Sequence, residues 1–276
     1  MKFSILTLFP EMFDGTLSNS IVHRAQSQGH IEIERVQIRD FALDRHSSVD
    51  DYSFGGGPGM VMKVDVMERA LASVIGEPSK EVKVDESGVG KKTSPHVVYL
   101  TPQGGRFSQE TASHFAKMDH LVLICGHYEG VDERFIDSYV DEELSIGDFV
   151  LTGGEIPAMT VVDAVARLRP GVLGDSESFR SDSFYESLLD HPHYTRPAQW
   201  SPDGGQNVDD DGSKQVVTPP AILLSGDHLA VKEGRRRHSL LRTLIRRPDL
   251  LDNAELSKVE KRLMNRLVQG LSEDLD

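Results

Sequence analysis

Side chains that can move protons follow a short apolar run near the middle of the chain. Residues 121–125 are apolar, and Gly126, His127, Tyr128 and Glu129 come directly after them. Imidazole and carboxylate groups serve as general acids and bases, and glycine lets backbone amides approach a bound molecule closely. The spacing therefore predicts a polar ligand-binding loop at the end of a buried strand.

Two other stretches repeat this pattern of an apolar run and a glycine-bearing loop. Residues 146–154, IGDFVLTGG, carry Asp148 among glycines, and the run 96–101 is followed by PQGG at 102–105. In α/β proteins, ligand crevices lie at the carboxyl ends of the strands, where such loops meet. One loop alone is most simply an ordinary turn, but the recurrence favours a shared crevice.

Other chemistries have weaker support. Cys125 precedes a glycine, as a nucleophile can, but no second histidine with an orienting acid stands out, which favours a buried structural cysteine. The glycine run 55–59 could cradle a phosphate, but it lacks the Lys-Ser/Thr end of a P-loop. His191 and His193 lack companion ligands at metal spacing, so no metal site is predicted. Without GxGxxG after the first strand, and without GxSxG, Rossmann dinucleotide or methyltransferase sites and a hydrolase elbow are unsupported.

Alternating strand and helix patterns must position these loops. Periodicity predicts strands at 2–8, 31–38, 96–101 and 121–125, and helices at 16–28, 64–76, 108–118 and 155–168. This alternation to about residue 170 predicts an α/β domain. A second, helical module is predicted from the patterns at 184–197 (in part), 227–246 and 256–270.

The remaining stretches are polar or rich in glycine and proline. Residues 39–62 have the composition of a long functional loop, and exposed, flexible segments are expected at 77–95, 171–183 and 201–215.

Charge is distributed unevenly along the chain. The net charge is −14, yet residues 228–270 hold eleven Lys and Arg against five Asp and Glu. Such a basic segment is either a nucleic-acid contact or a solvated helix face. The single cysteine allows no intramolecular disulfide, and no apolar run is long enough to cross a membrane. A cytoplasmic protein without membrane association is expected.

Six ordered motifs resemble the bacterial tRNA (guanine-N1-)-methyltransferases. They are DDYSFGGGPGM (50–60), YLTPQG (99–104), CGHYEGVDER (125–134), SIGDFVLTGGE (145–155), RPGVLG (169–174) and LLDHPHYTRP (188–197). The resemblance runs from Phe3 to about Leu251, and the stretches 77–95 and 201–215 look longer than is usual in the family.

The resemblance implies a fold and a domain organisation. The family has a trefoil-knotted catalytic domain of the SPOUT superfamily, an α/β fold with a parallel sheet, followed by a small, mostly helical C-terminal domain. The knot would involve residues 99–155, an exception to the usual unknotted topology. Carried over, the domains are 1–173 for cofactor binding, 174–183 as a flexible linker and 184–276 for tRNA binding.

The same resemblance implies S-adenosylmethionine bound in three knot loops. The matching cofactor-binding residues are Tyr99, Leu100, Thr101, Pro102, Gly126, Tyr128, Glu129, Ile146, Gly147, Asp148, Phe149, Val150, Leu151, Gly153 and Gly154. At two matched positions the sequence departs from many members, with His127 in place of arginine and Phe149 in place of tyrosine.

The implied reaction is methylation of N1 of guanosine 37 in a tRNA that carries G36 and G37. Asp182 matches the family's general base, Arg167 the arginine on guanine O6, and Glu129 the glutamate that holds either the guanine or Mg²⁺. From the sequence alone, Asp182 would be a helix N-cap and Arg167 a surface ion-pair partner. An obligate homodimer is implied, with active sites at the subunit interface. The alternatives are a knotted 2′-O-ribose RNA methyltransferase, a cysteine hydrolase and a non-catalytic RNA-binding protein.

Overall fold

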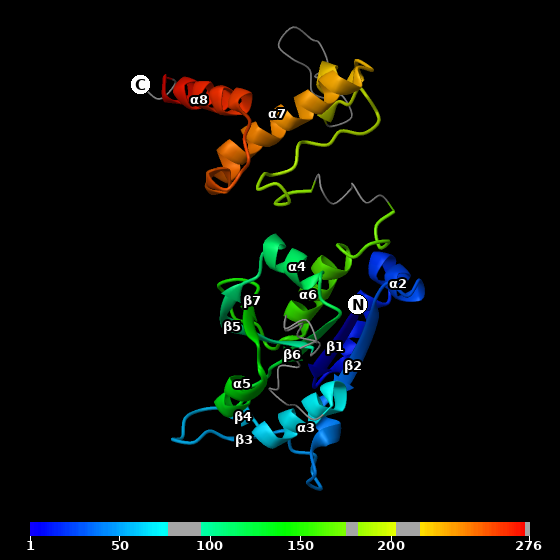
Figure 1. Cartoon of the computed structure of the whole chain (residues 1–276), viewed down its shortest axis with the longest axis vertical. Helices are drawn as coiled ribbons and strands as arrows, with labels where there is room; N and C mark the ends of the chain where they lie inside the picture. Colours follow the sequence, from blue (N-terminus) through cyan, green and yellow to red (C-terminus); the bar gives the residue numbers. More distant parts are fainter. Residues whose placement is uncertain (77–94, 175–181, 203–215, 274–276) are drawn as a thin grey trace, which may run out of the picture. The chain divides into compact units, whose positions relative to one another are not determined.

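The chain forms two compact units in a computed structural model that describes residues 1–76, 95–174, 182–202 and 216–273. The units are Met1–Ser176 and Glu177–Asp276 (Figure 1). Each has its own hydrophobic core.

A five-stranded parallel sheet forms the centre of the first unit. Its strands lie in the order β2-β1-β6-β5-β7, and every neighbouring pair is parallel. The strands are β1 (Lys2–Thr7), β2 (Glu32–Gln37), β5 (His96–Arg106), β6 (His120–Cys125) and β7 (Glu142–Ser145). The α/β fold expected from the strand–helix alternation is thus confirmed, and the carboxyl ends of the strands meet at one edge.

Helices cover both faces of this sheet (Figure 1). In β6, Leu121, Leu123 and Cys125 belong to the core on one face, whereas Val122 and Ile124 belong to the core on the other. A strand buried on both sides is apolar throughout, which explains the uninterrupted run at this position. The first face is covered by α2 (Ser20–Ser27), α4 (Gln109–Phe115) and α6 (Glu155–Ala166), and the second by α3 (Val64–Ile75) and α5 (Glu133–Tyr139).

The predicted helices occur with altered ends. The helix expected at 16–28 is divided into α1 (Asp14–Leu17) and α2, because Asn19 is extended and Ser20 has a φ of 55°. Ser108, the first residue of the helix predicted at 108–118, caps α4, with its hydroxyl accepting the Thr111 amide at 3.2 Å. Short 3₁₀ helices occur at η1 (Pro10–Phe13), η2 (Ile38–Phe41), η5 (Ala221–Leu224) and η6 (Pro248–Asp252).

Strand β5 continues beyond the position where the sequence predicts its end. It was expected to stop before PQGG, but it runs to Arg106 and pairs with β7 again after a register shift between Leu100 and Gly105. Gly104 makes this possible, because a Cβ there would lie 2.3 Å from the backbone carbon of Glu143. The glycine serves close strand approach rather than strand termination.

Strand β7 lies just before the apolar run 146–151, not within it. The apolar run at 146–151, which suggests another strand before a glycine-bearing loop, is not one: β7 covers Glu142–Ser145 and residues 146–154 form a loop. Gly147 has a φ of 154°, which leaves the strand conformation. The loop 39–62 also contains unexpected structure, an antiparallel hairpin of β3 (Asp50–Tyr52) and β4 (Met60–Met62).

The second unit is built around two helices, α7 (His228–Arg246) and α8 (Lys258–Glu273). Both were predicted, and the Asp227 carboxylate caps α7 by accepting the amides of Leu229 and Ala230. Leu188, Leu240 and Met264 form its small core. No helix forms within 184–197, which was expected to be partly helical; Pro192 and Pro197 interrupt any regular run there.

Some expectations fall outside the described residues. The flexible segments expected at 77–95, 171–183 and 201–215 lie largely in positions 77–94, 175–181 and 203–215, which the structure does not describe. Within the described ranges, every helix is too short or too polar to cross a bilayer.

Candidate active site

A pocket of about 440 Å³ lies at the carboxyl ends of β5, β6 and β7. It is lined mainly by residues 101–103 within β5 and by the loops 126–131 and 146–154, which follow β6 and β7. All the residues predicted to bind the cofactor line this pocket, except Asp148. The Asp148 carboxylate is instead exposed and accepts a hydrogen bond from Arg106 at 2.5 Å.

The pocket combines polar groups with apolar walls. Leu100 is buried beneath it, while Tyr128, Phe149 and Val150 are about half exposed or more. Glu133 and Glu143 also line it, although the sequence analysis did not single them out. Their positions depend on α5 and β7, so the residue pattern alone gave no signal for them.

Glu129 is held against the glycine run of the long loop 39–62. Its amide donates to the Met60 carbonyl at 3.0 Å. A Cβ at Gly59 would lie 2.2 Å from the Glu129 Oε1, and Gly59 has a φ of 83°. The GGGPG motif therefore makes room for the Glu129 carboxylate beside the pocket, which is a more specific role than the phosphate cradle that was considered.

A hydrogen-bonded group that the sequence analysis missed lies behind the pocket. The Thr7 hydroxyl donates to the Glu155 Oε1 at 2.6 Å, and the His127 Nε2 lies 2.8 Å from the Glu155 Oε2. Glu155 is 1% exposed, whereas His127 lines the pocket. A glutamate after two glycines gives no sign of burial in the sequence, because tertiary packing decides it.

Cys125 is a buried structural residue. It is fully buried in the core. Burial raises the pKa of its thiol well above the ordinary value, and the nearby negative charge of Glu155 raises it further. A reactive cysteine requires an accessible, stabilised thiolate. This environment therefore argues against the cysteine hydrolase hypothesis.

Arg167 and Asp182 are not among the described residues that line the pocket. Arg167 follows the last residue of α6 in the first unit and is half-buried. Asp182 belongs to the second unit, where its carbonyl accepts the Tyr185 amide at 3.4 Å. This bond lies in a turn rather than at the start of a helix, so the N-cap interpretation of Asp182 is wrong.

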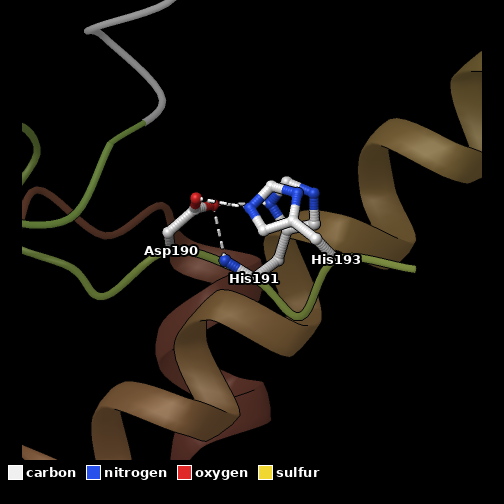
Figure 2. A group of neighbouring side chains, drawn as sticks. All are labelled: Asp190, His191 and His193. Carbon is white, nitrogen blue, oxygen red and sulfur yellow. Dashed lines mark hydrogen bonds and ion pairs between the residues drawn. The ribbon is translucent and has the colours of Figure 1, made fainter. Parts of the chain in front are cut away.

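A histidine–aspartate cluster in the second unit supplies the companion ligand that the sequence analysis did not find. Asp190, His191 and His193 converge in Figure 2, with a carboxylate oxygen 2.7 Å from a ring nitrogen of each histidine. Burial raises the pKa of Asp190, but hydrogen bonds from His193 and the His191 amide outweigh this and lower it. Burial and the positive charges of His193 and Arg235 lower the pKa of His191, against the effect of Asp190.

Imidazole and carboxylate groups are ligand types that bind Zn²⁺ and other divalent transition-metal ions. However, each Asp190 oxygen already bonds to a histidine, and Arg235 places a positive charge nearby. The internal contacts therefore account for the cluster without an ion.

The arginines of α7, and Arg247 directly after it, differ in their surroundings. Arg236 contacts Glu186 at 2.6 Å and Glu260 at 2.7 Å, which ties α7 to its neighbours. Arg247 pairs with Asp249 at 2.6 Å. Arg235, Arg237 and Arg246 are exposed. Arg236 therefore contributes to the packing of the unit, while the exposed arginines remain available to an external polyanion.

The fold and the pocket together define the general class of this protein. A parallel α/β sheet whose strand-end loops enclose a glycine-lined pocket is a small-molecule-binding domain of the α/β class.

Comparison with known proteins then gives the family. Residues 1–253 match the family described as tRNA (Guanine-1)-methyltransferase TrmD. A tRNA (guanine-N(1)-)-methyltransferase of Magnetococcus marinus is 58% identical over 277 residues, covering 100% of this chain and 98% of the relative. Proteins of that name from Geotalea uraniireducens and Desulforamulus reducens are 47% and 46% identical, covering 99% and 96% of this chain and 100% and 94% of the relatives. The chain belongs to this methyltransferase family, which confirms the resemblance.

Proposed function

We propose that this protein transfers a methyl group from S-adenosylmethionine to N1 of guanosine 37 in tRNA. The observation that carries the proposal is the pocket at the strand ends, whose lining includes nearly all the residues matched to the family's cofactor site. The names of the relatives support the tRNA substrate and the guanine N1 product. A cytoplasmic location accompanies a tRNA substrate.

The pocket fits S-adenosylmethionine in size and chemistry. Its volume of about 440 Å³ falls in the range of small-molecule sites. Gly126, Gly153 and Gly154 line it without side chains, which lets a ligand such as adenine approach the backbone closely, and Leu100 and Leu151 offer apolar cover. When bound, the cofactor supplies an electrophilic methyl group on a sulfonium.

The protein's own residues must prepare the guanine. Guanine N1 carries a proton and is a poor nucleophile until that proton is removed. In the proposal, Asp182 accepts the proton as general base, and Arg167 faces O6, where negative charge develops as the proton leaves. Glu129 orients the guanine or holds Mg²⁺. Glu133 and Glu143 line the same pocket and add the oxygen ligands that Mg²⁺ prefers.

The proposal includes the knotted fold and the homodimer that the family resemblance implies. The backbone around 99–155, which carries the pocket loops, would form the trefoil knot of the SPOUT superfamily. A homodimer would bring the cofactor pocket of one subunit together with tRNA contacts of the other. The exposed apolar side chains Tyr128, Phe149, Val150 and Ile156 lie in or beside the pocket loops, and contact with a second subunit would remove their apolar surface from water.

Comparing Asp182→Ala with wild type tests the mechanism. Labelled S-adenosylmethionine and a tRNA with G36 and G37 are supplied, the methylated nucleoside is identified, and cofactor binding is measured on both proteins. We expect wild type to methylate N1 of G37. The variant should lose about a hundredfold or more in turnover while keeping cofactor affinity. Full turnover by the variant would remove Asp182 as base, and a methylated ribose would favour the 2′-O-methyltransferase alternative.

A further inference from the structure

Among the acidic and basic side chains in the described parts of the chain, only that of Glu155 is almost completely buried. It begins α6, directly after the pocket loop 146–154. Burying a carboxylate costs free energy unless hydrogen bonds and opposite charge compensate. The positive end of the α6 dipole provides part of this compensation, and side chains from two other segments provide the rest.

These two side chains come from the ends of neighbouring strands. Thr7 is the last residue of β1, and its hydroxyl bonds to the Glu155 Oε1 at 2.6 Å. The same hydroxyl accepts the Phe9 amide at 2.9 Å. On the other side, the His127 ring lies 2.8 Å from the Glu155 Oε2 and stacks edge-on against Phe9, at a ring-centroid distance of 4.9 Å. Glu155 thus connects the end of β1, the loop after β6 and the start of α6.

The glycines of the pocket loop create the space for this connection. A Cβ at Gly153 would lie 2.3 Å from the His127 Nε2 and 2.5 Å from the Glu155 Oε2. The Gly154 amide also donates to the Gly126 carbonyl at 3.1 Å, so the two loops touch along their backbones as well. The imidazole therefore lies between the wall of the pocket and the buried carboxylate.

We infer that Glu155 is a positioning residue of the cofactor pocket, acting through His127. It holds the loop 126–130 against the loop 146–154, so that Tyr128 and Glu129 stay at the pocket. Tyr128 has a φ of 60°, a conformation that an isolated loop would rarely keep. The inference rests on the proposed function, because the ligand that reports on the pocket is S-adenosylmethionine.

The test is a double-mutant cycle on the full-length protein, with S-adenosylmethionine affinity from calorimetry and Tm from thermal unfolding. Glu155→Leu and His127→Leu each remove one side of the contact. We expect each to weaken cofactor binding about tenfold, the effect of losing one charge-assisted hydrogen bond. The double variant should bind S-adenosylmethionine no more weakly than the single variant with the lower affinity, because the two residues act as one unit. Glu155→Gln keeps an acceptor for Thr7 and an amide for His127, and should bind within about threefold of wild type.

Ser4→Ala is the matched control. Ser4 is also fully buried on β1, and its hydroxyl contacts Glu34 at 3.1 Å and His120 at 2.9 Å, away from the pocket lining. It should lower Tm without changing cofactor affinity. Additive losses in the double variant would overturn the positioning role. Unchanged affinity in His127→Leu would overturn it even if Glu155→Leu fails to fold. If wild type itself does not bind S-adenosylmethionine, the proposed function fails together with this inference.

Discussion

At the scale of single residues, two glycines of one loop allow the cost of a positive φ to be distinguished from the cost of a steric clash. Gly56 and Gly59 have φ values of 78° and 83°. At Gly56 a Cβ would meet nothing within 4 Å, whereas at Gly59 it would lie 2.2 Å from the Glu129 carboxylate. The two positions share one conformational demand and differ in what surrounds them.

This difference predicts unequal effects of the same substitution. Gly56→Ala should cost about 1 kcal/mol of stability through its positive φ and leave methyl transfer nearly unchanged. Gly59→Ala should lose a similar stability and also at least about tenfold in methyl transfer, because Glu129 must move. Initial rates and unfolding free energies measured on both variants decide the matter. Equal rates in the two variants would show that the position of Glu129 does not limit the reaction.

At the scale of the elements, the irregular pairing of β5 with β7 depends on one glycine of an adjacent pair. A Cβ at Gly104 would lie 2.3 Å from the Glu143 backbone, but a Cβ at Gly105 would come no nearer than 3.9 Å to it. Gly104→Ala should therefore destabilise the protein by about 2–3 kcal/mol, and Gly105→Ala by about 1 kcal/mol or less. Denaturant unfolding followed by circular dichroism compares them. Equal losses would mean that β5 can shift away from β7 at little cost.

The ion pair between Arg236 of α7 and Glu260 of α8 should make the stability of the second unit depend on pH. Burial raises the pKa of Glu260, but hydrogen bonds from Arg236 and Ser257 outweigh it and lower the pKa from 4.5 to about 2. Since the folded-state pKa is depressed, the stabilisation is complete above pH 4.5 and is lost as the pH falls towards 2. We expect Glu260→Gln to cost about 1–2 kcal/mol near neutral pH, and progressively less in this acidic range.

Trp200, the only tryptophan of the chain, lies in the same unit, and its fluorescence can follow the unfolding. A difference between wild type and Glu260→Gln that stays constant down to pH 2 would contradict the assigned pKa.

At the scale of the whole molecule, the acidic net charge of −14 means that the proposed binding of tRNA requires a local basic surface. Arg237 is exposed on α7, while Arg236 next to it is engaged with Glu186 and Glu260. Arg237→Ala should weaken tRNA binding and reduce the slope of log affinity against log salt by about 1, as expected for one phosphate contact. Arg236→Ala should instead lower Tm. An unchanged salt slope in Arg237→Ala would exclude that contact.

Much of the fold could be predicted because local patterns and tertiary packing agree. The run 121–125 is apolar on both faces of β6, and Ser108 and Asp227 begin helices that they cap. The pocket loops after β6 and β7 could be located because each carries glycines close to the end of a strand.

The remaining features depend on partners distant in the sequence. Strand β7 contains two glutamates and resembles no buried strand, yet it pairs with β5. The burial of Glu155, the contact of Asp190 with both histidines and the internal pairing of Arg236 are likewise set by tertiary packing. No local pattern in the sequence carries this information.

The burial of Cys125 has a practical consequence for spectroscopy. As the chain's only thiol, fully buried and with a raised pKa, it should stay inert to maleimide dyes while the protein is folded. A cysteine introduced on the exposed side of α7 could then be labelled selectively, without first removing the native one. Conversely, the rate at which a thiol reagent modifies Cys125 in the unlabelled protein would report how often the core of the first unit opens.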